Sequence, residues 1–277
     1  MNPSIRCRPF LGTFVEIGVT SDNEVTRRAV DDAFDAIGDV HRLLSFHDPE
    51  SDLSRLNASN GEWVRLHPLS LRVLRLAKGL TEQSGGLFNC TVGAHIVELG
   101  VLPNHLRHRS HRAASGLADD LVLKQNAAHL ASPILITLDG IAKGYAVDRA
   151  VAALLRGGVA SGWVNAGGDM RAFGDIALPV HQRSLTGELL PLGGLSGAAI
   201  ATSRVAPERD SRFPGCIVNT DGGQSCHGVW TVLARRAWRA DALTKVAANA
   251  PNSKRESWIE QLGGRLIVPE TGVEVAA

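Results

Sequence analysis

The sequence predicts an α+β fold in which helices and strands mix without a regular alternation. Three helical patterns occupy residues 21–45, 67–86 and 145–158. Several strand-like segments follow residue 160 and surround one further helical segment at 236–249. A doubly wound parallel sheet would show strands and helices alternating regularly along the chain. We therefore expect mixed sheets with packed helices, arranged in two closely associated lobes.

Length and composition predict a globular protein with a sizeable core. The chain has 277 residues, of which 44% are hydrophobic, and we treat residues 1–277 as a single domain. Its 29 basic and 28 acidic residues leave almost no net charge. Such a balance gives no field that attracts nucleic acid or an anionic membrane. We expect a small molecule or another protein as the partner, with no nucleic acid and no membrane insertion.

The cysteines and the first residues of the sequence indicate the cellular compartment. The four cysteines are far apart and form no C-x-x-C pair, so neither a zinc site nor a disulfide framework is indicated. The first residues lack an apolar run long enough for a signal peptide, and no segment is long enough to span a membrane. We expect a cytoplasmic protein, while a longer natural start would leave export open.

The first elements are predicted from periodicity. Residues 14–20 (FVEIGVT) alternate and are rich in β-branched residues, so they are interpreted as the first strand. In residues 21–45, Ser21 and Asp22 are candidate N-caps. The apolar residues that follow have roughly helical spacing, which predicts a long amphipathic helix: Val25, Ala29, Ala33, Ile37, Val40 and Leu44.

Two more helices flank a polar insertion. Residues 67–86 begin near Pro68 and end in a glycine pair, both typical of helix ends. Residues 145–158 (YAVDRAVAALLRGG) form the third helical pattern. Between these helices, residues 103–120 are polar and aperiodic, so we expect a loop insertion. No fixed carboxylate or thiolate accompanies its histidines, so we interpret them as surface residues rather than metal ligands: His105, His108 and His111.

The last part of the chain combines strands with one helix. The segments GWVNAG, AAIATS, GVWTVLA and GRLIVP are predicted strands. The helix at 236–249 contains the sequence ADALTK. Its Asp241, Thr244 and Lys245 stand at i, i+3 and i+4 and project from one face. Asp and Thr oxygens suit a hard cation, whereas a protonated lysine has no lone pair to offer. The spacing alone leaves a metal site and a salt bridge as alternatives.

Two glycine-rich segments are candidate ligand sites. In LDGIAKGYAVDRAV (138–151), a strand is expected to pass through Gly140 into a helix whose free amides, with Lys143, suit a phosphate. In VNAGGDMRAFG (164–174), Asp169 can accept hydrogen bonds from a ribose or a base edge. For residues 138–151 the alternative is a simple strand-to-helix turn, and for residues 164–174 it is a hairpin turn.

One further polar segment follows the long helix. In LSFHDPESDLSRLN (44–57), Ser51 and Ser54 can satisfy helix amides, and His47 can stack on an aromatic ligand. A purely structural cap is the alternative.

Taken in order, these segments resemble the FAD:protein FMN transferase (ApbE) family. The resemblance covers about residues 9–250 and is strongest in KGYAVD and NAGGD. It implies an α+β fold that holds FAD in a cleft between two lobes. It also implies a Mg²⁺-dependent reaction in which FMN passes from FAD to a threonine or serine hydroxyl of an acceptor flavoprotein, with release of AMP. FAD is then a substrate.

The resemblance also assigns positions. Leu11 replaces the methionine of the family's M-G-T, and His47 replaces a flavin-contacting tyrosine. Asn89 replaces the aspartate of A-F-D, and Thr137 replaces an aspartate that touches FAD. The implied flavin or FAD contacts are Leu11, His47, Leu87, Phe88, Asn89, Thr137, Lys143, Asp169 and Ile217. The implied metal ligands are the backbone carbonyl of Gly140, the carboxylate of Asp241 and the hydroxyl of Thr244.

The sequence departs from the family at two important places. The family's metal helix has a threonine four residues after the aspartate, where this chain has Lys245. The family's H-I-I-D-P-x-T-G corresponds to residues 216–223, so Cys216 replaces a functionally important histidine, and no catalytic base is assigned. The alternatives to a transferase are therefore a flavin-binding homologue in which Lys245 replaces Mg²⁺, and a protein that slowly hydrolyses FAD.

Overall fold

A seven-stranded antiparallel sheet forms the largest part of the protein. The computed structural model describes residues 4–104, 113–206, 216–220 and 225–268. The strand order is β1-β2-β6-β7-β10-β11-β12. The strands are β1 (Ser4–Phe10), β2 (Thr13–Val19), β6 (Gly162–Ala166), β7 (Asp169–Phe173), β10 (Ala199–Val205), β11 (Gly228–Ala234) and β12 (Gly264–Ile267).

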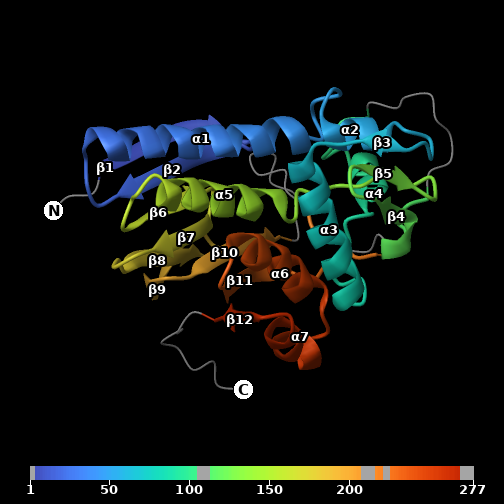
Figure 1. The fold of residues 1–277 in the computed structure, drawn as a ribbon. Coiled ribbons are helices and arrows are strands. Elements are labelled where there is room, and N and C mark those ends of the chain that lie inside the picture. The colour runs from blue at the N-terminus through green and yellow to red at the C-terminus, as the bar shows by residue number, and fades with distance from the viewer. Residues whose placement is uncertain (1–3, 105–112, 207–215, 221–224, 269–277) are drawn as a thin grey trace, which may run out of the picture.

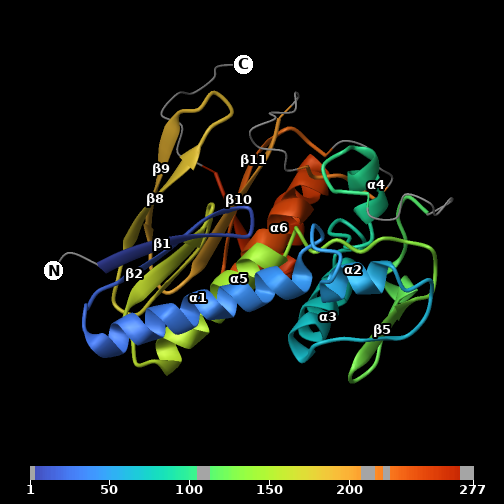
Figure 2. The same cartoon turned by 90° about the horizontal axis from the view of Figure 1, so that it is seen from above.

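Three helices cover one face of this sheet (Figures 1 and 2). They are α1 (Glu24–Leu44), α5 (Ala142–Arg156) and α6 (Ala237–Asn249). Helix α5 lies between the other two and packs on β6 and β7, whereas α6 packs on β10 and β11. The buried stripe of α1 includes Phe34 and Ile37, neither of which is exposed. The main core therefore lies between these helices and the sheet.

The remaining elements surround this layer pair. A smaller antiparallel sheet has the order β3-β5-β4 and lies beside α2, α3 and α4 (Figure 2). A two-stranded hairpin, β8–β9, projects at the far end. The bounds are α2 (Asp52–Asn57), β3 (Val64–Arg65), α3 (Pro68–Gln83), α4 (Gly93–Glu98), η1 (Ala118–Asp120), β4 (Leu121–Leu123), β5 (Ala127–Leu130), β8 (Leu178–Arg183), β9 (Leu189–Leu195), η2 (Asn252–Lys254) and α7 (Arg255–Gln261). Among the described residues, no helix is both long and apolar enough to cross a membrane.

The predicted α+β class is confirmed, with corrections at the N-terminus. The segment at 14–20 is not the first strand, because β1 precedes it and pairs with it antiparallel. The N-cap of α1 is Asn23, whose Oδ1 accepts from the Thr26 N–H at 2.9 Å, rather than Ser21 or Asp22. Pro68 does occupy the first turn of α3, as predicted. The three histidines interpreted as surface residues lie outside the described residues.

Two tight hairpin turns lie against each other at one end of the large sheet. Leu11 and Gly12 connect β1 to β2 with φ of 55° and 71°, while Gly167 and Gly168 connect β6 to β7 with φ of 63° and 101°. A Cβ on Gly167 would lie 2.7 Å from Thr13 Oγ1, so a larger residue would separate the turns. The NAGGD segment is therefore a hairpin turn, which places Asp169 at the start of β7.

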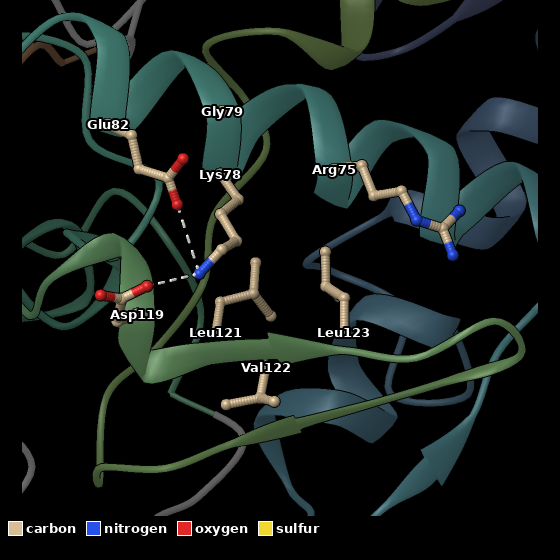
Figure 3. A pocket seen from close by; sticks show the side chains of 8 residues that line it. All are labelled: Arg75, Lys78, Gly79, Glu82, Asp119, Leu121, Val122 and Leu123. Carbon is tan, nitrogen blue, oxygen red and sulfur yellow. Dashed lines mark hydrogen bonds and ion pairs between the residues drawn. The ribbon is translucent and has the colours of Figure 1, made fainter.

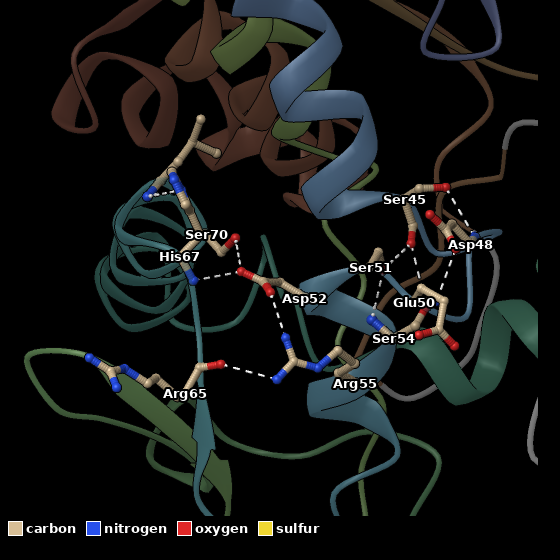
Figure 4. A network of polar contacts seen from close by, with 11 residues as sticks. Ser45, Asp48, Glu50, Ser51, Asp52, Ser54, Arg55, Arg65, His67 and Ser70 are labelled. Atoms are coloured by element: carbon tan, nitrogen blue, oxygen red, sulfur yellow. Dashed lines mark hydrogen bonds and ion pairs between the residues drawn. The ribbon is translucent and has the colours of Figure 1, made fainter.

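A polar network fixes the segment that follows α1 (Figure 4). Ser51 caps α2 by accepting from the Ser54 N–H at 3.0 Å, as predicted. The Ser54 hydroxyl does not cap; it donates to the Ser45 carbonyl at 3.4 Å. The buried carboxylate of Asp52 accepts from the His67 N–H and the Ser70 hydroxyl, both at 2.7 Å. These bonds join α2 to the start of α3 and hold the chain around His47.

Candidate functional site

Helix α6 places a buried carboxylate in direct contact with a lysine. The Lys245 Nζ lies 2.5 Å from Asp241 Oδ1 and 3.1 Å from the Asp241 carbonyl oxygen. It also donates to Ser203 Oγ on β10 at 3.3 Å. Asp241 is fully buried, whereas 17% of the Lys245 side chain is exposed. The two residues stand at i and i+4 of a helix, a spacing that brings their side chains together.

Thr244 points toward other protein groups. Its hydroxyl donates to the Asp241 carbonyl oxygen at 2.7 Å and lies 2.7 Å from Ser203 Oγ. The residue has no exposed surface. A threonine hydroxyl offers one proton and two lone pairs, and this arrangement uses the proton on the helix backbone. Thr244 therefore joins α6 to β10 in the described geometry.

The start of α5 supplies the second partner of Asp241. The Gly144 N–H donates to Asp241 Oδ2 at 3.0 Å, and the Ala142 N–H donates to the Leu138 carbonyl at 2.8 Å. Protein groups therefore satisfy two amides that were candidates for binding a phosphate. The strand expected before Gly140 is also wrong, since the only pairing in described residues 131–141 is an isolated bridge at Leu135.

Gly144 allows α5 and α6 to approach closely. A Cβ at this position would lie 2.2 Å from the Ala237 carbonyl oxygen and 2.8 Å from Asp241 Cβ. Real Cβ atoms essentially never approach other atoms so closely. The glycine therefore brings the first turn of α5 within hydrogen-bonding distance of the Asp241 carboxylate. This role of the KGY segment was not predicted from the sequence.

A second ion pair lies beside the first. The Lys143 Nζ is 3.2 Å from Asp169 Oδ2, which reaches it from β7. That oxygen is buried and has no contact with the geometry of a hydrogen bond, so charge attraction dominates the pairing. One third of the Lys143 side chain is exposed, against 5% of the Asp169 side chain. Lys143, Asp169, Asp241 and Lys245, here called the four-charge cluster, thus combine α5, β7 and α6.

The charges of the cluster influence one another. Burial raises the pKa of Asp169 to about 6, with a further upward contribution from the nearby Asp241 charge. Burial also opposes ionisation of Asp241, but the Lys245 and Lys143 charges and the Gly144 N–H outweigh it and lower the pKa of Asp241. The Asp169 charge is the main cause of a raised pKa at Lys143. Asp241 is therefore the carboxylate held in the ionised form.

Asp139 is a further carboxylate at this place. Its side chain is exposed, in contrast to Asp169 and Asp241. The surrounding protein shields the carboxyl of Asp139 from water and so raises its pKa. The charges of Lys143, His47 and Lys245 oppose that shift, Lys143 most strongly. Asp139 was not among the predicted site residues, although it stands in the LDGIAKGY segment. The structure thus groups a third carboxyl, from a residue at the surface, with His47 and the four-charge cluster.

Gly140 and Phe88 lie against the Lys245 side chain. A Cβ on Gly140 would be 3.2 Å from Phe88 Cε2 and 3.4 Å from Lys245 Cε. Phe88 is itself 3% exposed. Two residues predicted at the flavin and metal positions are therefore brought together with the lysine that departs from the family pattern.

The loop before Phe88 is joined to the segment that begins at Cys216. Asn249, at the end of α6, donates to the carbonyls of Leu87 at 2.9 Å and Val218 at 3.3 Å. Ser225 donates to the Ile217 carbonyl at 3.0 Å and to Asn249 Oδ1 at 2.6 Å. These bonds gather Leu87 and Ile217, both predicted flavin contacts, around one asparagine.

The other predicted contacts have local structural partners. Asn89 donates to the Gly116 carbonyl at 3.1 Å and accepts from the Thr91 N–H at 2.9 Å. Thr137 is 6% exposed, and its N–H donates to the Cys90 carbonyl at 2.8 Å. Leu11 occupies the β1–β2 turn and packs on the main core. These contacts are structural, and the roles of the three residues toward a flavin stay predictions.

A surface hollow elsewhere has no connection to the cluster. It lies between α3 and β4 (Figure 3). Lys78 bridges Glu82 at 3.4 Å and Asp119 at 3.0 Å across it. Its polar groups pair with one another, so we do not assign it a role. The lining residues are Arg75, Lys78, Gly79, Glu82, Asp119, Leu121, Val122 and Leu123.

Comparison with known protein families decides the assignment. The model of the ApbE family matches residues 11–268, which is most of the chain. The chain belongs to the ApbE family. The match includes every residue of the four-charge cluster and both hairpin turns described above. No relative was found among curated protein sequences.

Solved structures of ApbE proteins share the fold. The chain is 24% identical to the ApbE protein of Thermotoga maritima, with a TM-score of 0.81 over 98% of this chain and 96% of the other. It is 18% identical to the apo form of the flavinyl transferase ApbE of Pseudomonas stutzeri, with a TM-score of 0.79 over 97% and 95%. The flavin transferase ApbE of Vibrio cholerae is 20% identical, with a TM-score of 0.77 over 98% and 95%. Similarity at these identities establishes the α+β fold of the family.

The donor atoms of this ApbE chain do not fit Mg²⁺ in the arrangement described. Mg²⁺ requires nearly octahedral oxygen ligands at about 2.0–2.1 Å. Both carboxylate oxygens of Asp241 are already engaged, by Lys245 and by the Gly144 N–H, and the Thr244 hydroxyl donates to the backbone. The part of the chain that the structure describes contains no group of three His, Cys, Asp or Glu residues suited to a metal. We therefore derive no reaction step through a metal ion.

Proposed function

We propose that this chain transfers FMN from FAD to a threonine or serine hydroxyl of an acceptor flavoprotein. The four-charge cluster carries the proposal, because it brings the KGYAVD, NAGGD and ADALTK segments of the family to one place. Membership of the ApbE family and the flavin transferase names of similar structures support it. The family match over residues 11–268 further supports a single functional domain.

The bonds that change are those at one phosphorus atom. The acceptor hydroxyl oxygen forms a bond to the phosphorus on the FMN side of the FAD pyrophosphate. The bond from that phosphorus to the bridging oxygen breaks, and AMP leaves with the bridging oxygen and its electron pair. Negative charge grows on the leaving phosphate, so fixed cations near the pyrophosphate stabilise the transition state. Lys143 and Lys245 are the described cations that we assign to this role.

The flavin ring and the ribityl chain need neighbouring contacts. We assign the ring to the side formed by Phe88, which adjoins Gly140, and by Leu87 and Ile217, whose carbonyls are linked through Asn249 and Ser225. His47 and Leu11 are further proposed contacts at the edge of this region. Asp169 is nearly buried and pairs with Lys143, so we assign it to holding that lysine rather than to direct contact with FAD.

The hydroxyl proton needs an acceptor, and we propose Asp139 for this role. The residue is exposed at the surface, and its carboxyl lies close enough to Lys143, His47 and Lys245 to feel their charges. Asp139→Asn should lower the rate of transfer about 100-fold, in the range typical of a lost general base, while FAD affinity stays within about threefold. The matched variant Asp119→Asn alters an exposed carboxylate of the distant hollow and should leave both quantities unchanged. Equal rates for Asp139→Asn and the wild type would remove Asp139 from the mechanism.

The function is tested by following both products. Purified chain is incubated with FAD and an acceptor domain that a known ApbE enzyme modifies, with that enzyme in parallel. AMP is measured by chromatography and linked FMN by the mass of the acceptor. Equal amounts of AMP and linked FMN are expected. AMP without a modified acceptor would identify FAD hydrolysis, whereas neither product, while the parallel enzyme works, would leave a flavin-binding homologue.

A further inference from the structure

We infer that Lys245 takes the place of the divalent cation in this chain, and that the chain binds the pyrophosphate of FAD without a metal. The inference rests on the proposed function for the identity of the ligand. It goes further by naming the group that supplies the positive charge. The chemical class of ligand is a dinucleotide joined through a pyrophosphate.

The contacts of Asp241 carry the inference. Its Oδ1 lies 2.5 Å from the Lys245 ammonium, and its Oδ2 accepts from the Gly144 N–H at 3.0 Å. A metal ion bound at Oδ1 would have to displace the Lys245 ammonium or lie directly beside its charge. Displacing Lys245 would bring two cations together beside a single buried carboxylate, and Lys143 lies close enough to add to the repulsion. The lysine and a metal ion therefore exclude each other.

The lysine is also placed to reach a ligand. Its side chain is partly exposed and runs over Gly140, next to the Phe88 ring that we assign to the flavin side. An ammonium has three donors. Asp241 accepts two of them, and the third is directed to Ser203 Oγ at 3.3 Å, the longest of the three contacts. A phosphate oxygen can replace the serine hydroxyl without disturbing the pairing with Asp241.

The fixed positions of the two lysines support the same conclusion. Lys143 and Lys245 are each held by a carboxylate, Asp169 and Asp241 respectively. Each lysine is thus fixed in position before a ligand arrives, and a fixed cation stabilises a phosphate without being reordered. Thr244, the residue one position before Lys245, is buried and bonded to the helix, so it does not compete for the same space.

Metal binding and FAD binding are the measurements that test the inference. Mn²⁺, the probe for the divalent cation, is titrated into the protein with FAD present and followed by electron paramagnetic resonance. FAD affinity is measured by flavin fluorescence with Mg²⁺ and with EDTA. The wild type should bind no stoichiometric Mn²⁺ at micromolar concentration, and its Kd for FAD should change less than twofold between the two conditions. Lys245→Thr should bind FAD at least tenfold more weakly in EDTA, and Mn²⁺ should bind and restore the affinity.

The control is Lys254→Thr, which changes an exposed lysine of η2 and should behave as the wild type. Stoichiometric Mn²⁺ binding by the wild type, with a more than tenfold loss of FAD affinity in EDTA, would overturn the inference and leave the proposed function standing. If the wild type binds FAD in neither condition, the proposed function fails and the inference fails with it. Should Lys245→Thr not fold, the two wild-type measurements still decide the question.

Discussion

Replacing Gly144 with alanine is expected to separate α5 from α6 and to weaken both the fold and the site. The added methyl carbon would lie 2.2 Å from the Ala237 carbonyl oxygen, about 1 Å closer than such atoms tolerate. Relieving the clash by moving one helix about 1 Å would lengthen the bond from the Gly144 N–H to Asp241 Oδ2 from 3.0 Å to nearly 4 Å. The substitution therefore adds a steric clash and removes a hydrogen bond at the same time.

The size of the effect follows from these two contributions. Overpacking in a tight contact costs about 1–3 kcal/mol. Losing a hydrogen bond to a buried charged group costs another ~1.5–3 kcal/mol. Together they give a loss of about 3–6 kcal/mol, a large fraction of the ~5–15 kcal/mol by which a domain is usually stable. The free energy of unfolding is measured by urea denaturation, and FAD affinity is measured on the variant that remains folded.

The matched control is Gly79→Ala within α3. A Cβ at Gly79 would meet only the end of the Gln83 side chain, at 3.9 Å. Because alanine favours a helix more than glycine does, this variant should be more stable by up to about 1 kcal/mol. If Gly144→Ala unfolds at the same urea concentration as Gly79→Ala and keeps the wild-type affinity for FAD, the close approach of α5 and α6 is refuted.

Three further predictions concern buried groups. The pKa of Asp169, raised from 3.8 to about 6, means that its contribution to stability is complete below pH 4 and is lost as the pH rises through 6. Urea denaturation gives the free energy of unfolding of the wild type and of Asp169→Asn. The wild-type value minus the variant value should fall by up to ~3 kcal/mol between pH 4 and 7, and a rise would contradict the raised pKa of Asp169. Asp148 accepts from Arg171 at 2.5 Å and from the Trp238 N–H at 3.0 Å, so Asp148→Ala should lower the free energy of unfolding by about 3–5 kcal/mol. The control Asp35→Ala changes an exposed carboxylate and should have almost no effect, and equal denaturation midpoints for the two variants would contradict the prediction. Burial raises the pKa of Cys90 to about 11, whereas Cys7 and Cys226 are exposed. Brief alkylation of the native protein, read by peptide mass spectrometry, should therefore modify Cys7 and Cys226 but spare Cys90, and equal labelling of Cys90 would show that its site opens readily.

Periodicity predicted the elements that bury an apolar face. Helix α1 was predicted from apolar spacing, because one stripe of it faces the core. Helix α3 was predicted from the proline and the glycine pair at its ends. Helix α6 is buried around most of its circumference and shows no such stripe. Strand β1 was missed because its SIRCRPF sequence carries two arginines and a proline, which an edge strand tolerates. The β8–β9 hairpin was missed because glycines and prolines interrupt its alternation and much of it is exposed. Local preference alone does not reveal strands whose main support is pairing with a neighbour.

The site was predicted as a set of residues but not as a set of contacts. Asp241 and Lys245 were expected on one helix face because they stand at i and i+4. The pairing of Lys143 with Asp169 joins a helix to a strand, and no spacing in the sequence indicates it. Similarly, the use of the Gly144 amide by Asp241 depends on how two helices pack, which follows from tertiary structure. Asp139 was missed because two of its charged neighbours, His47 and Lys245, lie on distant segments of the chain.

Helix α6 sets a fixed length within the proposed ligand site. Asp241 and Lys245 stand in its middle, and Asn249 at its end holds the loops of Leu87 and Val218. Eight residues of helix separate Asp241 from Asn249, which corresponds to about 12 Å along the axis. A helix stretches very little, so α6 fixes the distance from Asp241 to the backbone of the Leu87 and Val218 segments. Under the proposed function, a dinucleotide is selected by the length of the chain between its phosphate and its ring as well as by the chemistry of either end.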